Sequence, residues 1–210
     1  MADNQSNELF GQTPSQTVGP FFHYGLPWKG GADLVGATDI GARPDLMPED
    51  HYLLAQSHAT VTEPVETITI EGVVVDGQGV PTPDVMVEIW QADPTGRYAG
   101  ESNSGFIGFG RSSTSEAGVY RFVTVKPGAV TDSDGMIQAP HIAFSILGRG
   151  MLKRLVTRLY FDGDVANESD PILGLVPHAR RDTLIAKARD GVWRFDIVLQ
   201  GVRETVFFDI

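Results

Sequence analysis

The chain has 210 residues, of which 41% are hydrophobic and 20% charged, so it is long and apolar enough to bury a sizeable core. It contains no cysteine, which excludes disulfides, thiol catalysis, iron–sulfur clusters and cysteine zinc sites. The net charge of −11 comes from residues 1–100, which hold 3 basic and 14 acidic residues, and it argues against nucleic-acid binding.

The first residues carry no targeting or membrane signal. Residues 1–16 are polar and lack a basic stretch followed by an apolar one, as a secretory signal would require. No apolar run approaches the roughly 20 residues that a membrane span needs. We therefore expect a cytoplasmic protein without a membrane partner.

The segment before residue 66 predicts little regular structure. Residues 1–12 are expected to form a flexible leader. Residues 13–28 are rich in proline, glycine and aromatic residues, and 29–65 resemble loops with a short helical turn near 48–56. Loops of this length are usually functional or lie at interfaces, so 13–65 is predicted to be an N-terminal arm at a subunit interface.

From residue 66 onward, apolar and polar residues alternate, which is typical of β-strands. The expected strands are 66–76, 85–91, 119–128, 141–147, 155–161, 193–199 and 204–210. Asp76-Gly77 predicts a turn, and a short helix is expected near 180–190 with Asp182 as its N-cap. Many strands without intervening helices predict an all-β fold, an antiparallel β-sandwich with one or two short helices, as a single domain over 13–210.

Several kinds of catalytic site are excluded by missing residues. The chain has no G-x-S-x-G nucleophile elbow. Its glycine- and serine-rich segment 108–118 lacks the lysine of a phosphate-binding loop. A calcium loop starting at Asp132 would need glutamate at position 143, where the chain has alanine.

Metal binding would require residues from distant positions, because no two of the five histidines have a metal-binding spacing. His141 and Ala143 share one face of an expected strand, so a histidine at 143 would have completed a pair. His141 is either half of a metal site or a buried, hydrogen-bonded histidine. Tyr98, at the end of a strand, is either a pocket residue or an ordinary loop tyrosine. Arg149 and nearby basic residues are either surface charge or a site for a small anion.

Six segments in one order resemble the intradiol ring-cleaving dioxygenase family. They are TPSQTVGPFF, VEIWQADPTGRY, GVYRFVTVKPGAV, APHIAFSILGRG, TRLYFDGD and RFDIVLQGVRETVFFDI. The similarity runs from about Thr13 to Ile210 and implies a β-sandwich core. It also implies a non-haem ferric iron, held by two tyrosines and two histidines, without an organic cofactor.

Four positions correspond by this resemblance to the iron ligands, and we call them the ligand-equivalent positions: Tyr98, Val130, His141 and Ala143. Valine and alanine donate nothing to a metal, so the chain is not expected to bind Fe(III) alone. The family includes enzymes built from alpha and beta chains, and the loss of two ligands is the mark of the alpha chain. The iron is then expected on a partner beta chain in a large alpha–beta oligomer.

The resemblance also implies a role for this chain in the partner's substrate pocket. Thr17, Gly19 and Pro20 are expected to line that pocket, and Arg149 to project towards it. A glycine backbone can approach a flat ring closely, and a guanidinium suits an anionic catechol such as 3,4-dihydroxybenzoate, which is cleaved with O₂. Arg149 could equally form an ion pair within the dimer.

Three alternatives remain at this point. The chain could be a purely structural partner of the iron-bearing subunit. The enzyme could act on another substituted catechol. The chain could also be a self-sufficient dioxygenase with an unusual ligand set.

Overall fold

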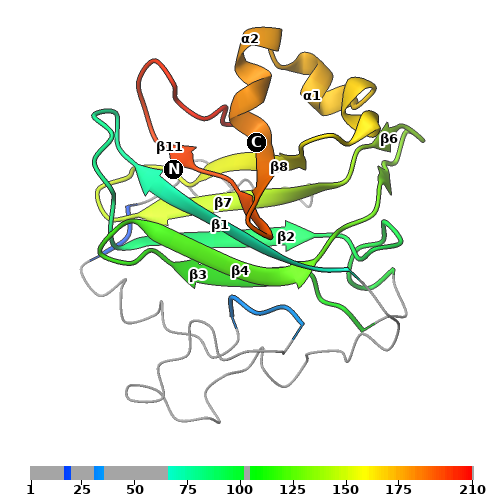
Figure 1. Cartoon of the computed structure of the whole chain (residues 1–210), viewed down its shortest axis with the longest axis horizontal. Coiled ribbons are helices and arrows are strands. Elements are labelled where there is room, and N and C mark those ends of the chain that lie inside the picture. The colour runs from blue at the N-terminus through cyan, green and yellow to red at the C-terminus, as the bar shows by residue number, and fades with distance from the viewer. Residues whose placement is uncertain (1–16, 20–30, 36–65, 102–104, 210) are drawn as a thin grey trace, which may run out of the picture.

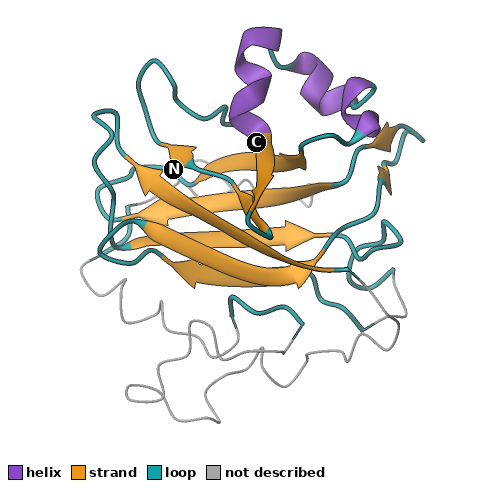
Figure 2. Cartoon of the chain, in the orientation of Figure 1, coloured by secondary structure: helices purple, strands orange, loops and turns teal. Residues whose placement is uncertain are grey.

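The computed structural model describes residues 17–19, 31–35, 66–101 and 105–209, and strands dominate them (Figures 1 and 2). The strands are β1 (Thr67–Val75), β2 (Val85–Gln91), β3 (Phe109–Ser113), β4 (Val119–Val125), β5 (Val130–Thr131), β6 (Ile137–Gln138), β7 (His141–Gly148), β8 (Leu155–Phe161), β9 (Ile185–Arg189), β10 (Val192–Arg194) and β11 (Ile197–Val198). The helices are η4 (Val165–Glu168), α1 (Pro171–Leu175), α2 (His178–Arg181) and η5 (Asp182–Leu184). The all-β prediction with short helices is confirmed, and none of the helices in these ranges is long and apolar enough to cross a membrane.

The strands form one strongly curved sheet, in the order β3-β2-β7-β8-β9-β10-β1-β4, with β11 beside β1 and a separate β5–β6 pair. In Figure 1, β1 and β4 cross in front of β7, β2 and β3, so the sheet folds over into two layers. The side chains between these layers form the core of the protein.

Residues 31–35 link the two edges of the curved sheet. Val123 of β4 exchanges backbone hydrogen bonds with Ala32 and Leu34, both at 2.8 Å. Gly110 of β3 makes room for this segment, since a Cβ there would lie 2.6 Å from Leu34 Cδ1. The sandwich is therefore closed on this side by a piece of the N-terminal arm.

Aromatic residues from both layers meet at the centre of the core. The Phe144 ring lies 5.9 Å from Tyr120 and 5.2 Å from Phe195, measured between ring centroids. Phe122 adds an edge-to-face contact at 6.3 Å. Burying large rings of this kind contributes most of the hydrophobic stabilisation of a small core.

The short helix expected over 180–190 is found only in its first part, as the end of α2 and as η5, and the prediction is wrong from Ile185 onward. Asp182 ends α2 and caps nothing with its side chain, and Ile185–Arg189 is strand β9, paired with β8 and β10. Asp190 and Gly191 both have positive φ angles, 52° and 76°, which form the tight turn between β9 and β10.

Three strand pairings are parallel and not antiparallel: β1 with β10, β1 with β11, and β8 with β9. The helical segment between β8 and β9 carries the chain back along the sheet, so that β9 can lie beside β8 and run in the same direction. The strand expected over 193–199 is split at Phe195 and Asp196. In the strand expected over 204–210, the described residues 204–209 form no strand and make one bridge, between Phe208 and Val156. Strand β3 was not expected. The leader 1–12, the helical turn near 48–56 and most of the arm 13–65 lie outside the described residues.

Candidate functional site

Two turns hold the segments that carry Tyr98 and Val130 against each other. The carboxylate of buried Asp93 accepts hydrogen bonds from the Thr95 amide and hydroxyl, at 2.8 and 2.7 Å. The Gly128 amide donates to the Asp93 carbonyl at 3.0 Å. A Cβ on Gly96 would lie 1.9 Å from the Ala129 carbonyl oxygen. The segment that carries Tyr98 is therefore packed backbone to backbone against the loop that leads to Val130.

Tyr98 lies flat on the indole of Trp90, with ring centroids 5.8 Å apart and 2° between the planes. Burial raises the pKa of Tyr98, and the positive charge of nearby Arg158 lowers it by a smaller amount. Trp90 faces Ala143 across the β2–β7 ladder. The Tyr98 ring therefore belongs to the same outer face of the sheet as Ala143.

His141 is a buried histidine, 2% exposed. Its Nδ1 lies 2.7 Å from the Ala139 carbonyl oxygen, so Nδ1–H donates to it and the ring is the Nδ1–H tautomer. Burial, and after it Arg158, lowers the pKa of His141 to about 4. The imidazole is thus neutral near pH 7, and its ring lies 5.9 Å from that of Tyr160.

The remaining two ligand-equivalent positions offer no donor atom. Val130 is buried and faces Gln138 in the β5–β6 ladder, and Ala143 lies between Trp90 and Arg158 on neighbouring strands. Among the described residues there is no group of three or more His, Cys, Asp or Glu side chains that could hold a metal ion. The structure brings the four positions together, but their side chains do not fit a ferric ion.

We expect the fold to lose stability as the pH is lowered, because of His141. The unfolded chain takes up a proton near the ordinary pKa of 6.5, whereas the folded chain does so only near 4. Between these values the unfolded state binds more protons, so lowering the pH removes up to about 3 kcal/mol from the free energy of unfolding. Urea unfolding between pH 4.5 and 7 measures the slope.

His141→Gln should flatten this slope, because its side chain does not titrate. The control is His178→Gln, at an exposed position, which should leave the slope as it is. An equal slope in the wild-type chain and in His141→Gln would contradict the assignment.

Arg149 lies far from the ligand-equivalent positions. It follows the last residue of β7, eight residues after His141, which corresponds to roughly 25 Å along an extended strand. Its guanidinium Nη2 lies 3.6 Å from Asp84 Oδ2, and the two side chains are 69% and 47% exposed. The sequence-predicted site residues therefore fall into two separate regions.

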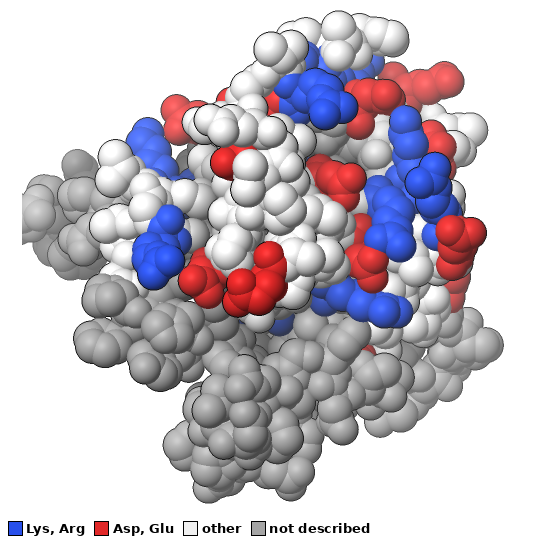
Figure 3. Space-filling model, turned by 60° about the vertical axis from the view of Figure 1, so that its left-hand side comes forward, with Lys and Arg blue, Asp and Glu red and all other residues white. Residues whose placement is uncertain are grey.

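A largely apolar groove of about 770 Å³ lies beside Arg149. Its apolar lining includes Pro83, Met151, Leu155 and Leu152, the last of which is 75% exposed. Figure 3 views the molecule from its left-hand side in Figure 1, where charged side chains surround a largely uncharged area.

Thr17 and Gly19 are exposed, and none of the described residues lies within 4 Å of where a Cβ of Gly19 would be. In the view of Figure 1 their segment lies on the same side of the sheet as the turn after β7. Pro20 lies outside the described residues.

Arg158, Tyr160 and Asp170 were not predicted as site residues. The Tyr160 hydroxyl donates to Asp170 Oδ1 at 3.0 Å, and Arg158 Nη1 donates to Gln138 Oε1 at 2.8 Å. Burial and Asp170 raise the pKa of Tyr160. The sequence carried one usable signal, Asp170-Pro171, which is typical of a helix start.

Comparison with known proteins identifies the family. The family model described as Dioxygenase matches residues 44–201. Two protocatechuate 3,4-dioxygenase alpha chains, from Burkholderia cepacia and Pseudomonas putida, are each 42% identical; they cover 95% and 96% of this chain, and the match spans 98% of each relative. The Burkholderia cepacia beta chain of the same enzyme is 36% identical over 81% of this chain and 77% of its own length.

Solved structures share the fold. The dioxygenase domain of a dioxygenase–carbohydrate-binding fusion from Streptomyces sp. SirexAA-E superposes with a TM-score of 0.53 at 21% identity, covering 95% of this chain and 97% of that one. Catechol 1,2-dioxygenase from Acinetobacter sp. ADP1 superposes with a TM-score of 0.54 at 22% identity, covering 65% of this chain and 53% of its own. On the sequence matches, with the fold in agreement, this chain belongs to the intradiol dioxygenase family.

Proposed function

We propose that this chain is the alpha subunit of an intradiol dioxygenase, working with a beta chain that carries the ferric iron. The enzyme would be cytoplasmic and would cleave 3,4-dihydroxybenzoate with O₂, giving 3-carboxy-cis,cis-muconate with both oxygen atoms retained. One observation carries the proposal: a chain 42% identical to such alpha chains has valine and alanine at two of the four ligand-equivalent positions. The ring-cleaving chemistry then belongs to the partner's iron.

The contribution of this chain would be the shape and charge of the shared pocket. We place Thr17, Gly19, Pro20 and Arg149 at that pocket. The ion pair between Arg149 and Asp84 is largely exposed, so it contributes little stability and can be exchanged for another carboxylate. A guanidinium binds a carboxylate through two parallel hydrogen bonds, which suits the carboxyl group of the substrate.

The surroundings of Arg149 support its place at an interface. Leu152 and the apolar groove beside it expose surface that a partner subunit would cover. Alpha and beta relatives both resemble this chain, which fits a complex of two similar sandwiches. We propose that the two chains pair through this end of the sheet and assemble into a larger alpha–beta oligomer.

Arg149→Ala in the assembled complex should lower kcat/KM for 3,4-dihydroxybenzoate by about 10- to 100-fold, the cost of losing a hydrogen-bonded charge on the substrate. Catechol without a carboxyl group should lose much less. Steady-state kinetics with both substrates measure the difference.

Arg203→Ala, at another exposed arginine, is the control and should leave both values unchanged. Equal kinetics in Arg149→Ala and wild type, with normal assembly, would favour the purely structural role. Equal losses with both substrates would contradict carboxylate binding.

A further inference from the structure

The ligand-equivalent positions surround a cation that belongs to the chain itself. Arg158 stands on β8 directly opposite Ala143 of β7. Its guanidinium Nη1 donates to Gln138 Oε1 at 2.8 Å, and Gln138 faces Val130 across the β5–β6 ladder. The side chain therefore runs from one position without a donor towards the other.

The same guanidinium acts on the two positions that keep a possible ligand. Its charge favours the anionic form of Tyr98 and disfavours the protonated form of His141. It also opposes the larger effects of burial and Asp170, which raise the pKa of the neighbouring Tyr160. Each of the four ligand-equivalent positions therefore pairs with Arg158, is affected by its charge, or pairs with its hydrogen-bond partner Gln138.

Carboxylates lie near this cluster: Asp132 Oδ2 accepts from Gln138 Nε2 at 3.5 Å, and Glu101 adds to the effect of burial in raising the pKa of Tyr98. Asp170, the buried acid beside it, is fully engaged: its Oδ1 accepts from Tyr160 and from the amides of Ile172 and Leu173, and Oδ2 accepts from the Ala139 amide. An arginine keeps its charge at every pH that proteins tolerate. The positive charge at this centre is therefore permanent.

We infer that the charge of Arg158 excludes metal ions from the ligand-equivalent positions. The two lost donors are then only one of two reasons why iron does not bind there. A guanidinium repels a ferric ion, and its hydrogen bond to Gln138 holds it among the four positions. Restoring the two donors alone should then fail to restore iron binding. This inference concerns the chain's own centre and does not depend on the pocket role of Arg149.

The test restores the donors with and without the arginine, in the full chain co-expressed with its beta partner. The variants are Val130→Tyr with Ala143→His, and the same pair with Arg158→Gln. Glutamine keeps a polar group that can bond Gln138 but removes the charge. Iron per alpha–beta pair is measured by elemental analysis of the purified complex.

The double variant should hold no more iron than wild type. The triple variant should gain about one iron per alpha chain, since the Coulomb repulsion that excludes the ion is gone. Arg154→Gln in the double background, at an exposed arginine in the turn before β8, is the matched control and should gain none. Arg158→Lys in that background keeps the charge and should also gain none.

Two results would overturn the inference: full iron loading of the double variant with Arg158 in place, or an assembled triple variant that gains no iron. If the triple variant does not assemble, the comparison is made in Ala143→His alone, with and without Arg158→Gln. That background has three donors, enough to hold a metal ion. Equal iron in those two variants would overturn the inference as well.

Discussion

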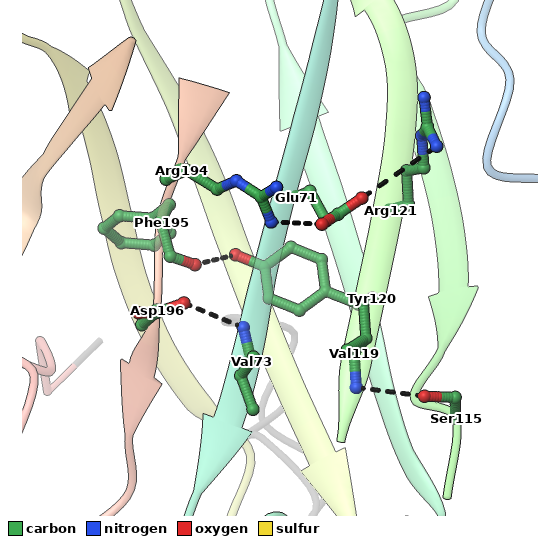
Figure 4. A network of polar contacts seen from close by, with 9 residues as sticks. All are labelled: Glu71, Val73, Ser115, Val119, Tyr120, Arg121, Arg194, Phe195 and Asp196. Carbon is green, nitrogen blue, oxygen red and sulfur yellow. Dashed lines mark hydrogen bonds and ion pairs between the residues drawn. The ribbon is translucent and has the colours of Figure 1, made fainter. Parts of the chain in front are cut away.

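Replacing Gly72 by alanine is expected to unfold the chain, or to lower its free energy of unfolding by at least about 4 kcal/mol. A Cβ at this position would lie 1.8 Å from the Phe195 carbonyl oxygen and 2.8 Å from the Tyr120 hydroxyl. Those two groups are bonded to each other, because the hydroxyl donates to the carbonyl at 2.5 Å (Figure 4).

The neighbours of Gly72 have little freedom to move. The Phe195 amide donates to the Glu71 carbonyl at 3.0 Å, and the Val73 amide donates to Asp196 Oδ1 at 3.0 Å. Figure 4 shows Phe195 and Asp196, which lie between β10 and β11, alongside β1. An added methyl group must therefore push β1 away from the segment between β10 and β11, which also breaks the buried Tyr120 hydrogen bond.

Thermal and urea unfolding of Gly72→Ala would measure the loss. Gly174→Ala in α1 is the matched control, because no other group lies within 4 Å of that position. Alanine favours a helix over glycine, so the control should be neutral or stabilising by up to about 1 kcal/mol. Wild-type stability of Gly72→Ala would show that β1 and residue 195 are not packed as described.

Asp170→Ala is expected to cost about 3–5 kcal/mol of stability, because it removes one partner from a buried hydrogen-bonded network. The carboxylate caps α1 through the Ile172 and Leu173 amides, at 3.0 and 2.7 Å. It also accepts from the Ala139 amide and the Tyr160 hydroxyl, at 2.8 and 3.0 Å. Alanine would leave all four donors buried without this acceptor.

Asp164→Ala separates this effect from ordinary helix capping. Asp164 caps η4 with a single bond to the Ala166 amide, at 3.1 Å, and should cost about 1 kcal/mol. Urea unfolding at pH 7 compares the two variants. A loss at Asp170 no larger than that at Asp164 would contradict a network role.

The strands with one buried face were predictable. In β1, β2 and β7, buried and less buried residues largely alternate, so the period of two is visible in the sequence. The Asp76 turn was also readable, since the Asp76 carboxylate accepts from the Gln78 and Val80 amides, as aspartate in turns commonly does.

Strands β9 and β3 could not be predicted from local preference. β9 reads IAKAR, a run of good helix formers, and it is a strand because it pairs with both β8 and β10. β3 reads FGRSS, which resembles a loop, and its Gly110 is there because another segment packs on it. In both cases tertiary contacts decide the local structure.

The missing iron ligands could be predicted from the sequence, but the position of Arg158 among the ligand-equivalent positions could not. Valine at 130 and alanine at 143 are visible in the sequence, and they predict a centre without a full ligand set. The register that sets Arg158 opposite Ala143, and the hydrogen bond from Arg158 to Gln138, depend on strand pairing between distant segments. A single sequence contains no direct signal of that pairing.

The iron content of this chain, purified without its partner, should be less than about 0.1 iron per chain, because two of the four ligand-equivalent positions lack a donor and Arg158 repels a metal ion. Elemental analysis of the purified chain measures it. Co-purification with the beta chain should give a complex with iron and ring-cleaving activity. Stoichiometric ferric iron in the isolated chain, with the absorption band of iron-bound tyrosinate, would show instead that this chain has an iron site of its own.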